Sequence, residues 1–355
     1  MDEMGRYIIR RILYMFVVLL VVSAITFLLM HAVPGGPFDK EKPVPKAQLA
    51  NLNARYHLDD PLPVQYLRYL NDIVVPHISN TPPGVSLEDD ALFNIPLGTG
   101  TWLKWMNFGP SYASKSRSVN DIFRDQLPIS FQLGVMALLL AIVIGIPLGI
   151  VAGLRQNTFW DYGAMGIAIL GVSVPAIVLG PLLVWIFGVN LKLLPPTGWG
   201  AKPPFALGIF PTNIGPEYFR YAILPAFALG FASSALIARL TRASLLQVIR
   251  EDYIRTARAK GLAERVVVSR HALKNSMIPV ITILGPLFAA LVTGTFVVEL
   301  IFGIPGMGKY FITSITNRDY PVIMGTILLY AIFLVVMNLV VDIMYAWLDP
   351  RIRYD

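Results

Sequence analysis

The residues whose spacing is most suggestive of chemistry form a glycine-rich segment, residues 303–310, that ends in Gly308, Lys309 and Tyr310. Up to its last position this segment matches a phosphate-binding loop, in which backbone N–H groups and a lysine hold nucleotide phosphates. That motif also needs a Ser or Thr hydroxyl for magnesium, which Tyr310 replaces here, and Pro305 lies inside the loop. We therefore interpret the segment as a tight turn or re-entrant segment that caps the outer end of an apolar span.

Other residue types that carry catalysis or bind metals are missing or scattered. The chain has no Cys, and its four His lie apart in sequence with no HExxH or similar ligand spacing. It contains no GxSxG or other nucleophile motif. Glu299 and Asp342 lie inside apolar segments, but near the ends of these segments, so we predict structural roles for both. We expect this chain to be no enzyme and to bind no metal or cofactor itself.

A charged, helix-forming stretch, residues 250–274, is the strongest candidate for a functional site. Residues 239–274 carry nine Lys or Arg against three acids. Ile254, Ala257 and Gly261 fall at i, i+3 and i+7, so they form a narrow stripe on one helix face. A helix with such a face can lie along the membrane surface and seat in a groove of another protein, and Gly261 suits the left-handed position that ends a helix. Because Tyr253 is the only aromatic residue of the stretch, we predict no nucleic-acid binding.

The elements that carry this stretch are apolar segments long enough to cross a bilayer. Of 355 residues, 55% are hydrophobic and only 14% are charged, far from the composition of a soluble domain. Six blocks approach the ~20 residues that a hydrocarbon core requires. The sequence therefore predicts an all-α integral membrane protein with six transmembrane helices, at residues 12–33, 129–154, 162–189, 221–246, 277–301 and 322–348.

The distribution of positive charge predicts the orientation. With both termini in the cytoplasm, the inside segments hold fifteen Lys or Arg, and the two short outside loops hold five. The predicted organisation is an N-terminal tail and first helix (1–33), an extracytoplasmic subdomain between helices 1 and 2 (34–127), and a transmembrane core (128–355) with a cytoplasmic loop (247–276).

Glycine and proline residues inside the spans indicate how these helices pack. Gly145, Gly149 and Gly153 repeat at four-residue spacing, which lets a neighbouring helix approach closely. Prolines lie inside the third and fifth spans, where neighbouring helices or a water-filled cavity must satisfy the freed carbonyl groups. These prolines, which suggest a bundle around a pathway, are Pro175, Pro181, Pro279 and Pro286.

The subdomain 34–127 is predicted to hold two helices, at residues 48–57 and 64–73. The second helix places Tyr66, Leu67, Leu70 and Ile73 on one face. Residues 80–101, rich in Pro and Gly and carrying acids at 88–90, show no clear period, and we predict an irregular excursion with few core contacts.

Ordered motifs cover nearly the whole chain: YIIRR (7–11), PGGP (34–37), YHLDDPLPVQYLRYL (56–70), FGPS (108–111), QNTFWDY (156–162), RTARAKGL (255–262), RHALKN (270–275), the turn at 303–310, NRDYP (317–321) and DPRIRY (349–354). In these motifs the chain resembles the oligopeptide/dipeptide ABC importer permeases, specifically the B-type transmembrane subunit of binding-protein-dependent transport systems. Residues 72–107 resemble an insertion relative to typical members, and we expect them to serve the outer face as a docking surface or a lid.

The resemblance implies a type I ABC importer permease fold that works by alternating access. It places the family's Glu-Ala-Ala loop, whose helix seats on an ATPase subunit, in residues 250–274. The Glu-Ala-Ala positions are occupied by Arg255, Thr256 and Ala257, of which the first two depart from the general pattern, and the motif glycine is Gly261. The expected ATPase-coupling residues are Asp252, Arg255, Thr256, Ala257, Arg258, Ala259, Lys260, Gly261 and Leu262.

The resemblance also implies the partners and the compartment. Expected partners are a second, C-type permease, one or two ABC ATPases that bind ATP and Mg, an extracytoplasmic peptide-binding protein, and the lipid of a bacterial or archaeal cytoplasmic (inner) membrane. The same machinery could carry a nickel complex, glutathione or an oligosaccharide, because these motifs report on coupling and not on cargo. An ion-coupled secondary transporter would need carboxylates at the middle of a span, and the sequence offers none. The motifs do not reveal which residues line the pathway.

Overall fold

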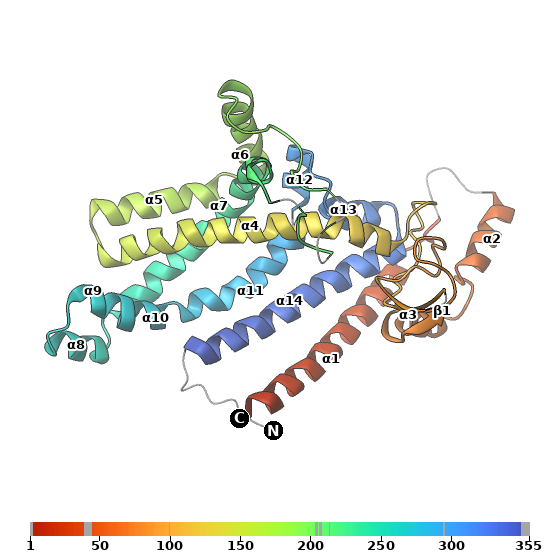
Figure 1. Cartoon of the computed structure of the whole chain (residues 1–355), viewed down its shortest axis with the longest axis horizontal. Helices are drawn as coiled ribbons and strands as arrows, with labels where there is room; N and C mark the ends of the chain where they lie inside the picture. The colour runs from red at the N-terminus through yellow and green to blue at the C-terminus, as the bar shows by residue number, and fades with distance from the viewer. Residues whose placement is uncertain are drawn as a thin grey trace. The chain divides into compact units, whose positions relative to one another are not determined.

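The computed structural model describes residues 3–38, 45–98, 100–202, 205, 208–212, 214–293 and 295–348. The C-terminal segment 349–355, which the orientation and the DPRIRY motif both use, lies outside the described residues. Among these described residues, four helices are long and apolar enough to cross a membrane; Figure 1 shows these helices. They contain four of the predicted spans and are α1 (Glu3–Ala32), α4 (Val119–Leu154), α7 (Pro216–Val248) and α14 (Tyr320–Leu348).

The other two predicted spans are not single straight helices. The third, predicted at 162–189, bends by 102° between α5 (Phe159–Ser173) and α6 (Ala176–Leu183), which continues into the π-helical segment η1 (Val184–Asn190). Pro175 causes the break, because proline disfavours a helical conformation in the residue before it, and the preceding Val174 is extended.

The fifth predicted span, 277–301, is likewise divided between two helices, α11 (Ile278–Thr293) and α12 (Phe296–Phe302). A 47° bend separates α11 from the short helices that precede it. Six crossings therefore result if each of the two bent helix pairs crosses the membrane once. The short helices that precede α11 are α9 (Glu264–Val266), the π-helical η2 (Val267–Ala272) and α10 (Leu273–Ser276).

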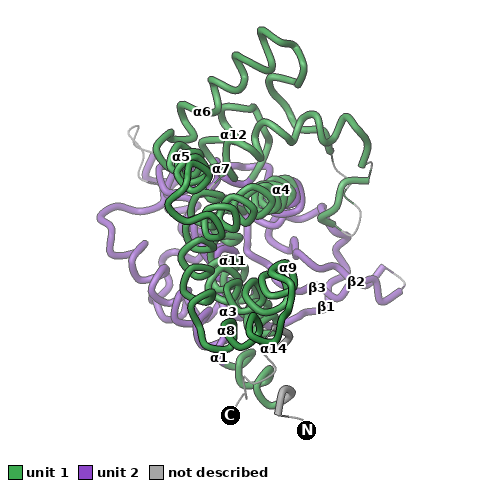
Figure 2. Tube along the Cα trace, turned by 90° about the vertical axis from the view of Figure 1, so that its left-hand side faces the viewer, with its two compact units in different colours: residues 1–13, 129–306, 332–355 green, residues 14–128, 307–331 purple. Residues whose placement is uncertain are grey.

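The chain divides into two compact units, which Figure 2 colours separately. Unit 1 comprises residues 1–13, 129–306 and 332–355, and unit 2 comprises residues 14–128 and 307–331. The predicted subdomain 34–127 lies wholly within unit 2.

In unit 1, α4 and α7 pack closely along the predicted glycine repeat. A Cβ atom added at Gly145 would lie 2.6 Å from the carbonyl oxygen of Ser234, and one added at Gly149 would lie 2.5 Å from Cβ of Thr241. Real Cβ atoms do not come so close, so only glycine permits this approach of the two helices. The prediction that Gly145, Gly149 and Gly153 allow a close helix neighbour is confirmed.

In unit 2, two helices appear close to where the sequence predicts them, at α2 (Lys46–Arg55) and α3 (Leu62–Val74). The predicted apolar face of α3 is only partly packed, because Leu67 is 64% exposed. Tyr66 and Tyr69 instead pack against an apolar cluster that contains Phe27.

The chain is mostly helical, as predicted, but unit 2 also contains a small antiparallel sheet that the sequence analysis did not predict. Its order is β1-β3-β2, with β1 (His77–Ser79), β2 (Phe93–Gly98) and β3 (Thr101–Trp105). The prediction of an irregular excursion at 80–101 is wrong for the residues of β2 and β3. The strands escaped detection because they are short and because Pro96 lies inside β2, where only an edge strand tolerates it.

The sheet is polar on its packed face and apolar on its exposed face. The side chain of Lys104 is 0% exposed, and its Nζ donates to the Asp89 carboxylate at 2.9 Å. On the other face of the sheet, the side chains of Phe93, Ile95 and Trp105 are exposed. The buried Lys104 charge requires a partner, because an unpaired buried charge is costly.

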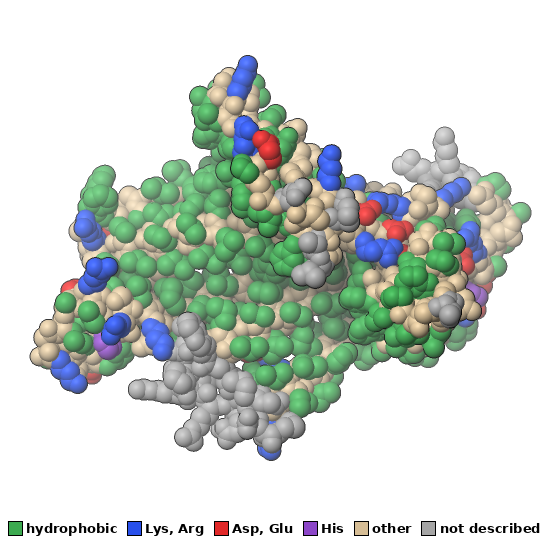
Figure 3. Space-filling model, in the orientation of Figure 1, with side chains coloured by type: hydrophobic (Ala, Val, Ile, Leu, Met, Phe, Trp, Pro, Cys, Tyr) green, Lys and Arg blue, Asp and Glu red, His purple; other side chains and the backbone are tan. Residues whose placement is uncertain are grey.

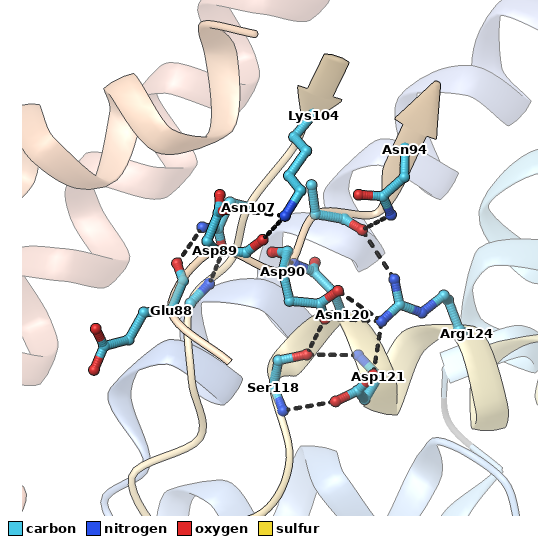
Figure 4. Close-up of polar contacts among 12 residues, drawn as sticks. Glu88, Asp89, Asp90, Asn94, Lys104, Asn107, Ser118, Asn120, Asp121 and Arg124 are labelled. Atoms are coloured by element: carbon cyan, nitrogen blue, oxygen red, sulfur yellow. Dashed lines mark hydrogen bonds and ion pairs between the residues drawn. The ribbon is translucent and has the colours of Figure 1, made fainter. Parts of the chain in front are cut away.

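The acidic cluster 88–90 supplies that pairing, so it is no free acidic surface (Figure 4). The Asp90 side chain is 1% exposed and receives the Arg124 guanidinium at 2.8 Å from both carboxylate oxygens, together with a hydrogen bond from Ser118. Because Arg124 belongs to α4, these contacts fix the insert to the start of a long helix. The expectation of few core contacts across residues 80–101 is therefore wrong.

Asp89 is held ionised by the same network. Burial alone would raise the pKa of Asp89, but hydrogen bonds from Ser79, His77 and Lys104, with the Lys104 charge, outweigh it and lower the pKa to about 2. The carboxylate therefore stays charged, and stays paired with Lys104, at all ordinary pH values.

Candidate functional site

The charged stretch 250–274 forms a compact helical unit at the end of α7. After α7 stops at Val248, the chain turns and enters α8 (Asp252–Ala259). Asp252 lies in the first turn of α8 and Arg258 in the last, which matches the helix dipole at both ends. The short helix predicted in this stretch is therefore present, and it contains the stripe residues Ile254 and Ala257.

One face of α8 packs against the chain itself. Ile254 is 0% exposed and Ala257 is 6% exposed, and both lie in a buried cluster with Leu245 of α7 and with Val267 and Ala272 of η2. The stripe that we expected to seat in another protein instead attaches α8 to its own neighbours. Ala257 thus offers no exposed surface to a partner, which corrects its place among the predicted contact residues.

The opposite face of α8 is open. Asp252, Arg255, Thr256, Arg258, Ala259, Lys260, Gly261 and Leu262 are all exposed, so eight of the nine predicted coupling residues share this surface. We call these eight residues the α8 outer face. Figure 3 shows Lys and Arg side chains around α8, α9 and α10, whereas the neighbouring flank of α4, α5 and α11 is apolar.

Local ion pairs arrange the charges of the α8 outer face. Arg255 lies 3.1 Å from Asp252, and Arg258 pairs with Glu264 of α9 at 2.7 Å. Exposed pairs of this kind add little stability. Both guanidinium groups lie on the exposed surface, each beside a carboxylate.

Gly261 ends α8 in the predicted conformation. Its φ is +75°, in the left-handed region that favours glycine, and its N–H donates to the Arg258 carbonyl at 2.9 Å. A Cβ atom at Gly261 would meet nothing within 4 Å. Within this chain the residue is therefore required for its backbone conformation alone.

Two further contacts join helices near this site, one between α8 and α10 and one between α5 and α7. The side-chain amide of Asn275 donates to the Tyr253 hydroxyl at 2.7 Å, which joins α8 to α10.

Asp161, at the start of α5, accepts two hydrogen bonds of 2.7 Å from Arg242 of α7. The sequence analysis missed this bidentate pair, since the two residues lie 81 positions apart. The available signal was an acid directly before the predicted start of an apolar span.

The two intramembrane acids have hydrogen-bonded roles within the fold. Glu299 is buried and accepts hydrogen bonds of 2.5 Å from Ser130 and from Thr295. Asp342 pairs with Arg11, whose Nε lies 2.7 Å from the carboxylate. These contacts support the predicted structural roles.

The glycine-rich segment 303–310 is a turn between two helices. Gly303 ends α12 in the left-handed conformation at φ +61°, and α13 (Gly308–Thr316) begins five residues later. A phosphate-binding loop follows a buried strand, whereas this segment follows a helix. Lys309 lies over the ring of its neighbour Tyr310 at 4.9 Å. The interpretation as a tight turn is confirmed. Among the described residues, no cluster of three or more His, Asp or Glu is placed to hold a metal.

Long apolar helices, with a charged helical unit exposed between α7 and α11, indicate a multi-pass membrane protein. The model of the family "binding-protein-dependent transport system inner membrane component" matches residues 145–354, and the model of its N-terminal region matches residues 4–84. The chain belongs to this family, whose members are inner-membrane components of ABC importers.

Individual relatives agree with the family over the full length. The chain is 43% identical over 350 residues to the dipeptide transport system permease protein DppB of Bacillus subtilis, covering 99% of this chain and 98% of that protein. It is 38% identical over 351 residues to the oligopeptide transport system permease protein OppB of Salmonella typhimurium, covering 99% and 100%. A solved structure of the MetNI methionine ABC transporter aligns with a TM-score of 0.48 at 15% identity, over 63% of this chain and 94% of that chain.

Proposed function

We propose that this chain is the transmembrane permease subunit of an ATP-driven importer of dipeptides or oligopeptides. With a second, C-type permease it forms the translocation pathway. The observation that carries the proposal is the 43% identity to a dipeptide permease over nearly the whole of both chains. The chain itself performs no chemistry, and ATP and Mg are bound by partner ATPases.

The α8 outer face is the surface that seats on an ATPase. Because Ile254 and Ala257 are buried against α7 and η2, a displacement of α8 is passed directly to Leu245 and Val267. The bidentate pair between Asp161 and Arg242 carries the displacement further, to α5. Closure of the ATPase dimer would thus move several core helices together and change the side from which the pathway is open.

We also infer the orientation of the chain in the membrane, its partner proteins and its cargo. Both termini lie in the cytoplasm of a bacterial or archaeal cell, as the bias of fifteen against five basic residues favours. One or two ATPases and an extracytoplasmic peptide-binding protein complete the complex. The alternative cargoes, a nickel complex, glutathione or an oligosaccharide, use the same coupling surface. An ion-coupled mechanism has less support, because Glu299 and Asp342 are engaged in contacts within the fold.

The test is ATP-driven uptake by the complex reconstituted with its partners in proteoliposomes. Arg255, whose side chain is 71% exposed on the α8 outer face, is changed to Glu. The matched control is Lys202→Glu, an equal charge reversal at an exposed residue of the loop predicted outside. We expect Arg255→Glu to lower both dipeptide uptake and co-purification of the ATPase, and Lys202→Glu to leave both unchanged. Equal behaviour of the two variants would contradict the coupling role, and uptake of nickel complexes or glutathione in place of dipeptides would contradict the cargo.

A further inference from the structure

Unit 2 contains a cavity that is separate from the α8 outer face. Its volume is about 330 Å³, at the lower end of the range of small-molecule sites. Five parts of unit 2 form its walls: the end of α1, the region from α2 to α3, Glu88, the segment around residues 107–112, and the start of α14. Apolar lining comes from Phe27, Met30, Phe108 and Met324.

The cavity wall is held in place by backbone contacts. The side-chain amide of Asn107 donates to the Glu88 carbonyl at 2.7 Å, and the Asn107 N–H donates to the Asp72 carbonyl at 3.0 Å. In Figure 4 the Glu88 carboxylate points away from the Asp89 and Asp90 network. The insert that carries Glu88 is itself fixed to α4, so the cavity is built into the fold of unit 2.

Tyrosine rings form much of the lining. Tyr56 and Tyr112 lie with ring centroids 4.6 Å apart, and Tyr69 and Tyr320 also line the cavity. The Tyr69 hydroxyl is buried and has no hydrogen-bond partner among the described residues. A buried hydroxyl without a partner costs free energy, and a ligand in this cavity could relieve that cost. Aromatic faces in such a wall attract cations.

Among the charged side chains that line the cavity, one carboxylate has no ion-pair partner within the described residues. Arg55 pairs with Glu88 at 2.9 Å, and Arg68 pairs with Asp60 at 3.1 Å. Within the described part of the chain, Asp72 has no ion-pair partner, although its side chain is partly buried in the same wall. Burial accordingly raises the pKa of Asp72, and the opposing effects of Asn71, His77 and Arg68 do not offset it.

We infer that this cavity binds a primary ammonium group attached to an apolar body, with Asp72 as the counter-ion. The tyrosine rings would contact the ammonium and its apolar neighbour, and the Tyr69 hydroxyl would gain the partner that it lacks. The N-terminus of a short peptide has this chemistry, and so has a Lys side chain. The inference concerns unit 2 alone and does not depend on the proposed role in translocation.

The test uses the purified full chain in lipid nanodiscs, without ATPases, and titration calorimetry. The first probe is the dipeptide Phe-Ala, and the second is N-acetyl-Phe-Ala, which lacks the ammonium. A third probe, the amide of N-acetyl-Phe-Lys, carries its only ammonium on the Lys side chain. We expect saturable binding of Phe-Ala and none of N-acetyl-Phe-Ala. Binding of the third probe would assign the site to Lys side chains as well, and its failure would restrict the site to peptide N-termini.

Variants of residues in the cavity wall then test whether Phe-Ala binds in this cavity. Asp72→Asn should weaken Phe-Ala binding by about tenfold or more, the effect of losing a hydrogen bond between charged groups, and Tyr69→Phe should weaken it less. The control is Asp59→Asn, the same change at an exposed residue that does not line the cavity. Asp72→Asn should unfold at no lower temperature than the wild type, because it removes a carboxylate that burial disfavours. Unchanged Phe-Ala affinity in Asp72→Asn, or no saturable binding to the wild type, would overturn the inference.

Discussion

Replacing Gly261 by Asp should abolish transport while leaving the chain folded and inserted. Gly261 has φ +75°, and a Cβ at this position meets nothing within 4 Å. The cost within the chain is therefore limited to backbone strain, about 1 kcal/mol for a residue with a side chain in the left-handed region. If this surface seats closely on the ATPase, the same change buries an unpaired carboxylate between the two proteins. That burial costs about 3 kcal/mol or more, which lowers the affinity of the chain for the ATPase roughly a hundredfold.

A matched control separates the two effects. Gly84 has φ +79°, also has open space around its Cβ position, and lies in the insert, far in sequence from α8. Gly84→Asp should lose the same ~1 kcal/mol and keep full uptake. The assays are ATP-driven dipeptide uptake in proteoliposomes, co-elution of the ATPase, and thermal unfolding in detergent. Wild-type uptake by a normally inserted Gly261→Asp chain would refute the reasoning, and so would an equal loss in both variants.

Three further outcomes are expected. Asp161→Asn should lower the free energy of unfolding by about 2–3 kcal/mol, because it leaves Arg242 without its partner; a double-mutant cycle that finds no coupling between the two residues would contradict this. Asp89 has a lowered pKa of about 2, so its pairing with Lys104 stabilises the protein above about pH 4 and is lost as the pH falls toward 2; protection of the sheet amides from hydrogen exchange, followed across this range, should fall in step. Lys309→Ala should leave ATP hydrolysis by the complex unchanged, and loss of ATP binding would show that the turn interpretation is wrong.

Features that depend on local sequence were predicted well. The helix at α8, the left-handed Gly261 and the close approach at Gly145 each follow from spacing within one segment, and the structure contains all three. Hydropathy likewise located the four continuous spans, because burial in lipid requires long uninterrupted apolar helices.

Features that depend on contacts between distant segments were not predictable from one sequence. The stripe of Ile254 and Ala257 was correctly placed on a single face, but its pattern could not reveal whether that face packs inward or outward. The acids at 88–90 looked like a solvent-exposed charge cluster because the partner of Asp90, Arg124, lies 34 positions away. The strands of the sheet were missed because each has at most six residues.

The close packing of α4 on α7 has a mechanical consequence. Pro225 lies inside α7, where a missing backbone hydrogen bond makes a hinge, and the helix beyond it to Val248 is about 35 Å long. A tilt of about 10° at that hinge would sweep the α8 end through roughly 6 Å. Because Gly145 and Gly149 contact this part of α7 with no intervening side chains, we expect α4 to move together with it. Under the proposed coupling role, a displacement of α8 would therefore move α7 and α4 together.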